Sequence, residues 1–270
     1  MPSMNSEAGK DDLMRDTIRI RISLAILLID DFTGKIMIEP SFRIAVRGAG
    51  KPIRKSDGFW IFTNLTEPEA QVSIIGPCYQ SEYIRLDLTT LDSANPVVRI
   101  RMKPDKTYRL LKETTCMAGF LPDGAALMVF CEQGNDYKKL LVDYEQGSAE
   151  ISLYQGGNEE MEGKLCCIAD KDKKKEIIKL GRMTDREKGL YQLAQPPLRE
   201  YKKIGTKIYP VSLAQAREDG GEYFLPLSGN GQDRLEYTCI YDVGGSKTEE
   251  RVMLDSGRVN RIDWETRKKR

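Results

Sequence analysis

The stretch GKPIRKSDGFWIFTNL (Gly50–Leu65) decides the fold of the first part of this chain. Its SDG segment (residues 56–58) has the composition of a tight turn. The run that follows alternates, with Trp60 and Phe62 on one face. We interpret it as a β-strand whose two aromatic side chains pack in a core.

Similar runs surround this stretch, in SFRIAVRG, QVSIIG, SEYIRLDL and PVVRIRMKP. An earlier run, ISLAILLI (Ile22–Ile29), is apolar apart from Ser23, which predicts a strand covered on both faces. Together these runs make about seven short strands, with turns about every eight to twelve residues. Residues 16–105 are therefore predicted to form an antiparallel β-sandwich.

Strand-like runs continue to the end of the chain, so residues 106–265 are predicted to form a second β-rich domain, a sandwich or a barrel. A division of this domain near residue 195, beside two prolines, is an alternative. The segment Asp185–Leu193 fits either a short helix or an extended link. Residues 1–15 are expected to form a flexible tail and residues 266–270 a basic tail.

The composition limits the possible functions. The chain of 270 residues has a net charge of +1, so no global charge argues for nucleic acid or an anionic membrane. It contains no histidine, which removes Ser-His-Asp and Cys-His catalysis and histidine zinc sites. The N-terminus has no apolar signal-peptide core, which favours a cytoplasmic protein. The six cysteines are then expected to be free thiols, most of them buried.

Residues 16–105 also carry motifs of a known family, namely DDFTGKIM (residues 30–37), RIAVRG (43–48), RKSDGFWIFTNL (54–65) and AQVSIIGPCYQSEYIRLDL (70–88). In these motifs the segment resembles the carboxypeptidase-regulatory-like, or transthyretin-like, β-sandwich. The family usually has a proline where Met37-Ile38 stands and a Pro-Gly turn where TEPEA (66–70) stands. The resemblance implies a non-catalytic accessory or adhesion-like domain, of a kind that also occurs in phage tails and contractile injection particles. It does not extend to residues 107–270.

Each candidate for a chemical site fails on its spacing. Gly50-Lys51 is followed by Pro52, and a phosphate loop would need a glycine where Ala45 stands. Cys166 and Cys167 point to opposite faces of a strand, so they cannot chelate one metal ion.

Acidic residues give no stronger signal. The segment DKDKKKE (residues 170–176) lacks the third calcium ligand and the glycine of a calcium loop, and indicates a charged turn. Asp30-Asp31 and Glu159-Glu160 are paired carboxylates within predicted turns, where acidic residues are common. We therefore predict no catalytic, cofactor-binding or metal-binding residue.

A basic strip runs along the first domain, beside the aromatic residues of its central strand. Its members are Arg19, Arg21, Arg43, Arg47, Lys51, Arg54 and Lys55. A nucleic-acid platform would need exposed aromatic rings, whereas Trp60 and Phe62 are expected in the core, so nucleic acid is disfavoured. Surface loops remain candidates for recognition, at Gly157–Glu162, Ala216–Gly221 and Ser228–Asp233.

These observations favour a non-enzymatic, cytoplasmic structural or adaptor protein that acts through protein–protein contacts in a larger assembly. A contractile injection system or phage-tail-like particle is one setting. A carbohydrate-binding or adhesion module is an alternative, which would need exposed aromatics such as Tyr137, Tyr144 or Tyr154. A further alternative is an enzyme with a carboxylate, Lys or Tyr site in the second domain, which would need a deep pocket with a buried ionisable group.

Overall fold

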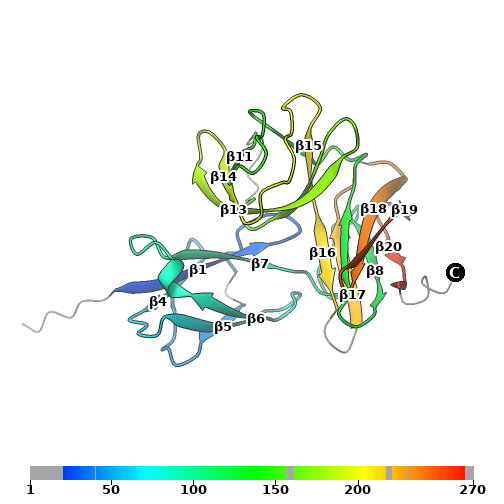
Figure 1. Cartoon of the computed structure of the whole chain (residues 1–270). Coiled ribbons are helices and arrows are strands. Elements are labelled where there is room, and N and C mark those ends of the chain that lie inside the picture. Colours follow the sequence, from blue (N-terminus) through cyan, green and yellow to red (C-terminus); the bar gives the residue numbers. More distant parts are fainter. Residues whose placement is uncertain are drawn as a thin grey trace, which may run out of the picture.

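The computed structural model describes residues 21–39, 41–154, 156, 161–216, 221–229 and 231–264. Its regular structure is almost entirely β, so the predicted all-β class is confirmed. The strands form three lobes, each with its own hydrophobic core (Figure 1). Lobe 1 contains β1–β7, lobe 2 contains β10–β15, and lobe 3 contains β8, β9 and β16–β20. The two predicted tails, residues 1–15 and 266–270, lie outside the described residues.

Lobe 1 is a sandwich of two sheets, ordered β3-β4-β1-β7 and β2-β5-β6, around one core. Trp60 and Phe62 are buried in that core, as the alternation predicts. The strands are β1 (Ile22–Asp30), β2 (Arg43–Val46), β3 (Ile53–Arg54), β4 (Phe59–Thr63), β5 (Glu69–Ile75), β6 (Glu82–Asp87) and β7 (Val97–Met102), with the 3-10 helix η1 (Leu88–Thr90) before β7.

One pairing in lobe 1 differs from the expected antiparallel arrangement, because β7 runs parallel to β1. The chain leaves β6 in one sheet, crosses through η1, and enters β7 at the edge of the other sheet. The expectation for β1 itself is confirmed, since residues 24–30 are buried on both faces. Leu28 and its register partner Ile100 face the core, so Leu27 and Ile29 face outward with Arg99 and Arg101.

Lobe 2 has a six-stranded sheet ordered β10-β15-β12-β13-β14-β11. A bridge between Leu140 and Leu153 joins the two ends, which closes the sheet into a small barrel around the lobe's core. The strands are β10 (Lys138–Lys139), β11 (Glu150–Ser152), β12 (Leu165–Ala169), β13 (Lys175–Asp185), β14 (Leu190–Leu193) and β15 (Lys207–Pro210). The segment 185–193 is thus neither a helix nor an extended link: residues 186–189 form the turn that joins β13 to β14. Residue 195 lies between two strands of this sheet, and the proposed division of the chain there stays a prediction.

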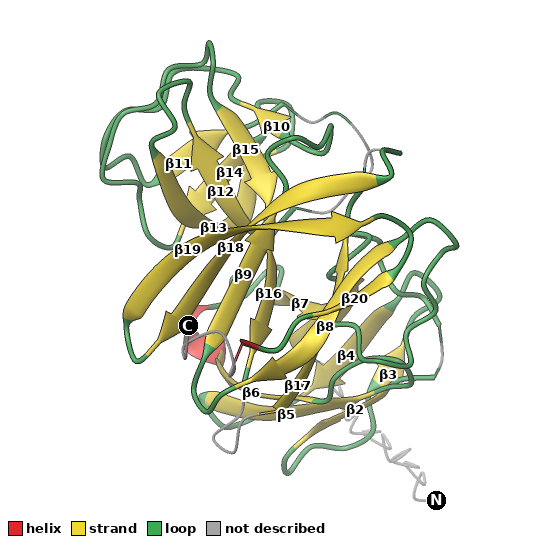
Figure 2. Cartoon of the chain, turned by 90° about the vertical axis from the view of Figure 1, so that its right-hand side faces the viewer, coloured by secondary structure: helices red, strands yellow, loops and turns green. Residues whose placement is uncertain are grey.

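Lobe 3 is built from chain segments on both sides of lobe 2. One sheet is ordered β16-β9-β18-β19 and the other β17-β8-β20, so β9 pairs with strands that follow lobe 2 in the sequence (Figure 2). Lobe 2 is therefore an insertion between β9 and β16. The strands are β8 (Thr115–Leu121), β9 (Ala126–Phe130), β16 (Ser212–Gln215), β17 (Gly221–Leu227), β18 (Arg234–Val243), β19 (Ser246–Asp255) and β20 (Val259–Arg261).

A fourth hydrophobic cluster joins lobes 2 and 3, and we call it the apolar interface. Its fully buried members are Met128, Phe130, Cys167, Ala169, Tyr209 and Val211. Cys166 lies in the core of lobe 2 instead, so the two adjacent cysteines face opposite sides of β12 as predicted. All six cysteines are free, and four are buried.

Candidate functional site

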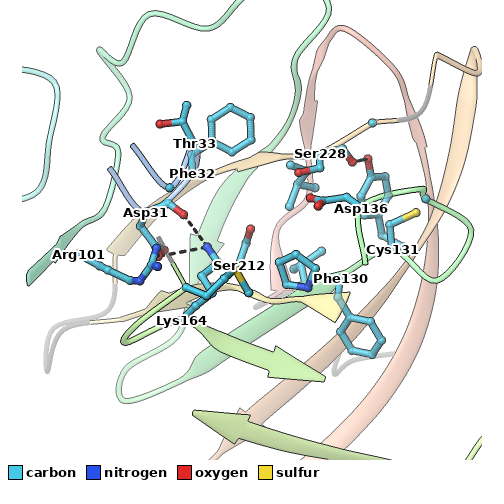
Figure 3. A pocket seen from close by; sticks show the side chains of 18 residues that line it. Asp31, Phe32, Thr33, Arg101, Phe130, Cys131, Asp136, Lys164, Ser212 and Ser228 are labelled. Carbon is cyan, nitrogen blue, oxygen red and sulfur yellow. Dashed lines mark hydrogen bonds and ion pairs between the residues drawn. The ribbon is translucent and has the colours of Figure 1, made fainter. Parts of the chain in front are cut away.

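A cavity of about 220 Å³ lies where the three lobes meet (Figure 3). Lobe 1 contributes the turn after β1 and Arg101 of β7, and lobe 2 contributes Met161 and Lys164. Lobe 3 contributes the end of β9, the start of β16 and the segment 227–229. We call it the junction cavity. A site assembled from all three lobes exists only when the whole chain is folded.

The turn after β1 begins with Asp30, which organises the local backbone. Its Oδ1 accepts hydrogen bonds from the backbone N–H groups of Phe32 and Thr33, at 2.9 and 3.1 Å. Its Oδ2 accepts bonds from the hydroxyls of Tyr79 and Tyr108, at 2.9 and 2.5 Å. Burial and the Asp30 charge raise the pKa of both tyrosines, so their hydroxyls stay protonated donors. Asp30 is thus a structural residue, consistent with its predicted place in a turn.

Asp31 points the other way, toward lobe 2. Lys164 Nζ donates to its carboxylate Oδ1 at 3.1 Å and to its backbone carbonyl at 2.5 Å, and Arg101 Nη1 lies 3.4 Å from Oδ1. These side chains are largely buried, with exposed fractions of 18% for Asp31 and 9% each for Lys164 and Arg101. Burial alone would raise the pKa of Asp31, but Lys164 and Arg101 outweigh it and hold the pKa below its usual value.

A second pairing strengthens the same contact between lobes 1 and 2. Arg99 Nη1 lies 3.2 Å from Glu162 Oε2, and Arg101 Nε donates to the backbone carbonyl of Glu162 at 2.9 Å. We call these contacts, with the Asp31–Lys164 pair, the polar interface. Both arginines alternate with core-facing residues along β7, so their side chains lie on the outward face of the lobe 1 sheet, which contacts lobe 2.

The opposite wall of the junction cavity belongs to lobe 3 and to the chain entering lobe 2. It includes Cys131, Asp136 and Ser228 (Figure 3). Burial raises the pKa of the Cys131 thiol, which keeps it protonated and a poor nucleophile near neutral pH. Asp136 lies across the cavity from Lys164, and its carboxylate makes no hydrogen bond or ion pair with any described residue.

The junction cavity continues into two neighbouring hollows. One shares Phe32, Leu227, Ser228 and Gly229 with it, and the other shares Gly229 and includes Gln232 and Asp233. The loop Ser228–Asp233, predicted as a recognition loop, therefore lines this surface, although residue 230 is outside the described residues. Of Gly157–Glu162 only Met161 and Glu162 are described, and of Ala216–Gly221 only the two end residues.

The other sequence candidates have structural roles where they are described. Asp170 Oδ1 accepts backbone N–H bonds from Asp172 and Lys174, both at 2.9 Å, which closes the predicted charged turn. Gly50 and Lys51 lie between strands and precede no helix. Glu159-Glu160 lies outside the described residues. Within the described ranges, no three His, Cys, Asp or Glu side chains come together as a metal site would require.

Few of the candidate aromatic residues expose a ring that could stack on a sugar or a base. Tyr144 is buried in the core of lobe 2, and Tyr137 packs against Tyr209 with Lys207 over its ring at 4.3 Å. Tyr154 alone of the three predicted tyrosines is well exposed. In the basic strip, Arg54 lies over Trp60 at 5.5 Å, and the buried rings of Trp60 and Phe62 leave no stacking surface.

Sequence reasoning missed Lys164, Arg101 and Asp136, because they come together only through the contact of separate lobes. One signal was present: two arginines at alternate positions of β7, opposite apolar residues, indicate a face that needs acidic partners. In the part of the chain that the structure describes, we find no helix with the length and apolarity to cross a bilayer.

Two comparisons, with family models and with curated proteins, were informative only in being negative. No family model matches the chain, and no curated protein matches it significantly.

Proposed function

We propose that this chain is a non-enzymatic structural or adaptor protein that acts through protein–protein contacts in a larger assembly. The observation that carries the proposal is the fixed joining of three β lobes. An apolar cluster joins lobes 2 and 3, and largely buried ion pairs join lobes 1 and 2. A rigid scaffold of this kind presents its loops at fixed positions, which suits recognition of a partner.

The best candidate for a contact surface lies on lobe 2, in the connection between β14 and β15. Leu198 and Ile204 are 78% and 88% exposed, and both line one hollow of about 400 Å³. Charged residues surround them, among them Lys171, Lys202 and Glu200. Apolar side chains within a polar rim are typical of the centre of a protein interface.

The test is native purification of the tagged chain, with measurement of the mass and stoichiometry of the complex. We expect a defined complex that Leu198→Asp with Ile204→Asp weakens by tenfold or more, because a buried charge would replace each apolar contact. Met253→Asp is the matched control, since Met253 is an exposed apolar residue of lobe 3. Recovery of the monomer alone from native cells would contradict the proposal.

The family and setting form the finer part of the same proposal. We propose that lobe 1 is a carboxypeptidase-regulatory-like domain and that the protein works in the cytoplasm, in a contractile injection or phage-tail-like particle. The two-sheet sandwich supports the first point, and six free cysteines support a reducing compartment. Genes for sheath, tube or baseplate proteins beside the coding sequence would support the particle, and their absence would argue against it.

An enzyme is the second candidate, because the junction cavity does contain buried ionisable groups. The ionisable groups of this cavity are, however, poorly suited to acid–base or nucleophilic catalysis. Asp31 is ion-paired with a lowered pKa, so it is a weak proton acceptor, and Cys131 is held as a thiol. Loss of a turnover reaction in Asp136→Asn, with the fold intact, would favour the enzyme over the adaptor.

A further inference from the structure

The two sides of the junction cavity carry opposite charge. On one side, the ammonium group of Lys164 lies at the cavity wall beside Asp31 and Arg101, and it is the positive group that a ligand can reach. On the other side, Asp136 supplies a negative charge (Figure 3). A cavity with this arrangement is complementary to a ligand that is itself positive at one end and negative at the other.

Lys164 retains a donor for such a ligand. An ammonium group has three N–H donors, and two acceptors of Asp31 lie within hydrogen-bond distance of Nζ, at 2.5 and 3.1 Å. No other described residue accepts a hydrogen bond from this ammonium group. Its third N–H is therefore available to an oxygen in the cavity.

Asp136 offers the complementary acceptor. Its carboxylate has about four lone-pair sites, and no donor among the described residues uses them. It is half-buried at the wall of the cavity. An ammonium group of a ligand would form a charge-assisted hydrogen bond here, which is stronger than a bond between neutral groups.

The walls of the cavity are partly apolar and leave little room. Val129, Phe130, Met161 and Leu227 line the cavity. Its volume of about 220 Å³ is below the range typical of drug-sized ligands, about 300–1,000 Å³. A ligand must therefore be small, with a compact apolar part between or beside its charges.

We propose that the junction cavity binds a small zwitterion of the α-amino-acid class. The ligand carboxylate accepts from Lys164, and the ligand ammonium group donates to Asp136. The apolar walls hold its side chain. Because the binding groups come from different lobes, the bound zwitterion also links lobe 2 to the chain entering it from lobe 3. This site is separate from the protein contact surface proposed on lobe 2.

The test uses the full-length chain and the free proteinogenic L-amino acids, each at millimolar concentration, with binding followed by calorimetry and by ligand-observed NMR. We expect at least one amino acid with an apolar side chain to bind. For L-leucine the matched analogues are 4-methylpentanoate, which lacks the ammonium group, and 3-methylbutylamine, which lacks the carboxylate. Each analogue should bind at least tenfold more weakly, because it leaves one charged group of the cavity unmatched.

Variants of the protein locate the site. Asp136→Asn should weaken amino-acid binding by tenfold or more without affecting the fold, because Asp136 has no partner to lose among the described residues. Asp123→Asn, in the exposed turn between β8 and β9, is the matched control and should bind as the wild type does. Lys164→Met removes the ammonium group that would bind the ligand carboxylate and leaves Asp31 paired with Arg101, and it should also lose binding.

Three results would overturn the proposal. One is the absence of binding by every amino acid tested. Another is equal binding by Asp136→Asn and the wild type. The third is a single-charge analogue that binds as tightly as its parent, which would show a simple anion or cation site.

Discussion

Lobe 2 meets its two neighbours through interfaces of different chemistry. Toward lobe 3 it buries an apolar cluster that includes Phe130 and Tyr209, whose rings stack at 6.3 Å. Toward lobe 1 it relies on the ion pairs Lys164–Asp31 and Glu162–Arg99. Apolar burial is non-directional and stabilises strongly, whereas a buried ion pair offsets its own desolvation and instead favours one geometry. Lobes 2 and 3 should therefore unfold together, while lobe 1 depends on charge for its position.

The largest effect is expected at the apolar interface. Phe130→Ala should lower the free energy of unfolding by about 3–5 kcal/mol, since it opens a cavity in a fully buried cluster. Urea denaturation monitored by tryptophan fluorescence measures the change. Phe120→Ala in β8 is the matched control, because Phe120 is exposed and should cost far less. Equal losses in the two variants would contradict the role assigned to the apolar interface.

A smaller effect is expected when one partner of the polar interface is removed. Lys164→Met should cost about 1.5–3 kcal/mol, the usual value of a hydrogen bond to a charged group, because Asp31 then keeps only Arg101. The double variant Asp31→Asn with Lys164→Met should cost less than the sum of the two single variants, since the Asp31–Lys164 interaction is then lost only once. A double-mutant cycle from denaturation data measures the coupling. Additive losses would show that the pair contributes nothing.

Acid should reveal how much a carboxyl group near each interface contributes to stability. A carboxyl whose pKa is lowered on folding stabilises the protein above its unfolded pKa, and this stabilisation is lost as the pH falls through the folded pKa. Asp31 is such a group, and the usual pKa of its carboxyl is 3.8. The free energy of unfolding should therefore decrease as the pH drops below about 4. Glu132, beside the apolar interface, also has a lowered pKa, because hydrogen bonds from Lys175 and Thr238 outweigh its burial.

Denaturation at several pH values therefore needs two variants. Asp31→Asn should show a shallower acid loss than the wild type, and Glu132→Gln should remove a different part of the same slope. If Asp31→Asn has the same acid profile as the wild type, the polar interface does not depend on this carboxylate.

The smallest effect is expected at the rim of the polar interface. Arg182 Nη2 lies 3.7 Å from Asp92 Oδ2, and the two side chains are 51% and 42% exposed. Exposed pairs of this kind contribute about 0–1 kcal/mol, so Arg182→Ala should change the melting temperature very little. A loss comparable to that of Lys164→Met would show that the burial of an ion pair does not determine its contribution to stability.

The sequence predicted features that depend on neighbours along the chain. Alternation identified β4 and placed Trp60 and Phe62 inside, because each face of a strand repeats every two residues. The same rule separated Cys166 from Cys167. These predictions needed no knowledge of what the strands pair with.

The features that it did not predict depend on residues far apart in the sequence. Asp31 was correctly placed in a turn, but its partner Lys164 lies 133 residues away. Likewise, nothing near β9 indicates that it pairs with β16 and β18 across the whole of lobe 2. The junction cavity could not be predicted because each lobe supplies only part of its wall.

The insertion of lobe 2 into lobe 3 has a consequence for synthesis on the ribosome. Strand β9 leaves the exit tunnel on the order of 80 residues before β16, its first sheet partner, and at about 5–20 residues per second this takes roughly 4–16 s. During that time Met128 and Phe130 have no sheet to cover them. Lobe 2 cannot close its own sheet in that interval, because β15, which lies between β10 and β12, ends just before β16 begins. Lobe 2 and the sheet of lobe 3 therefore gain their missing strands almost together, and β9 waits for both.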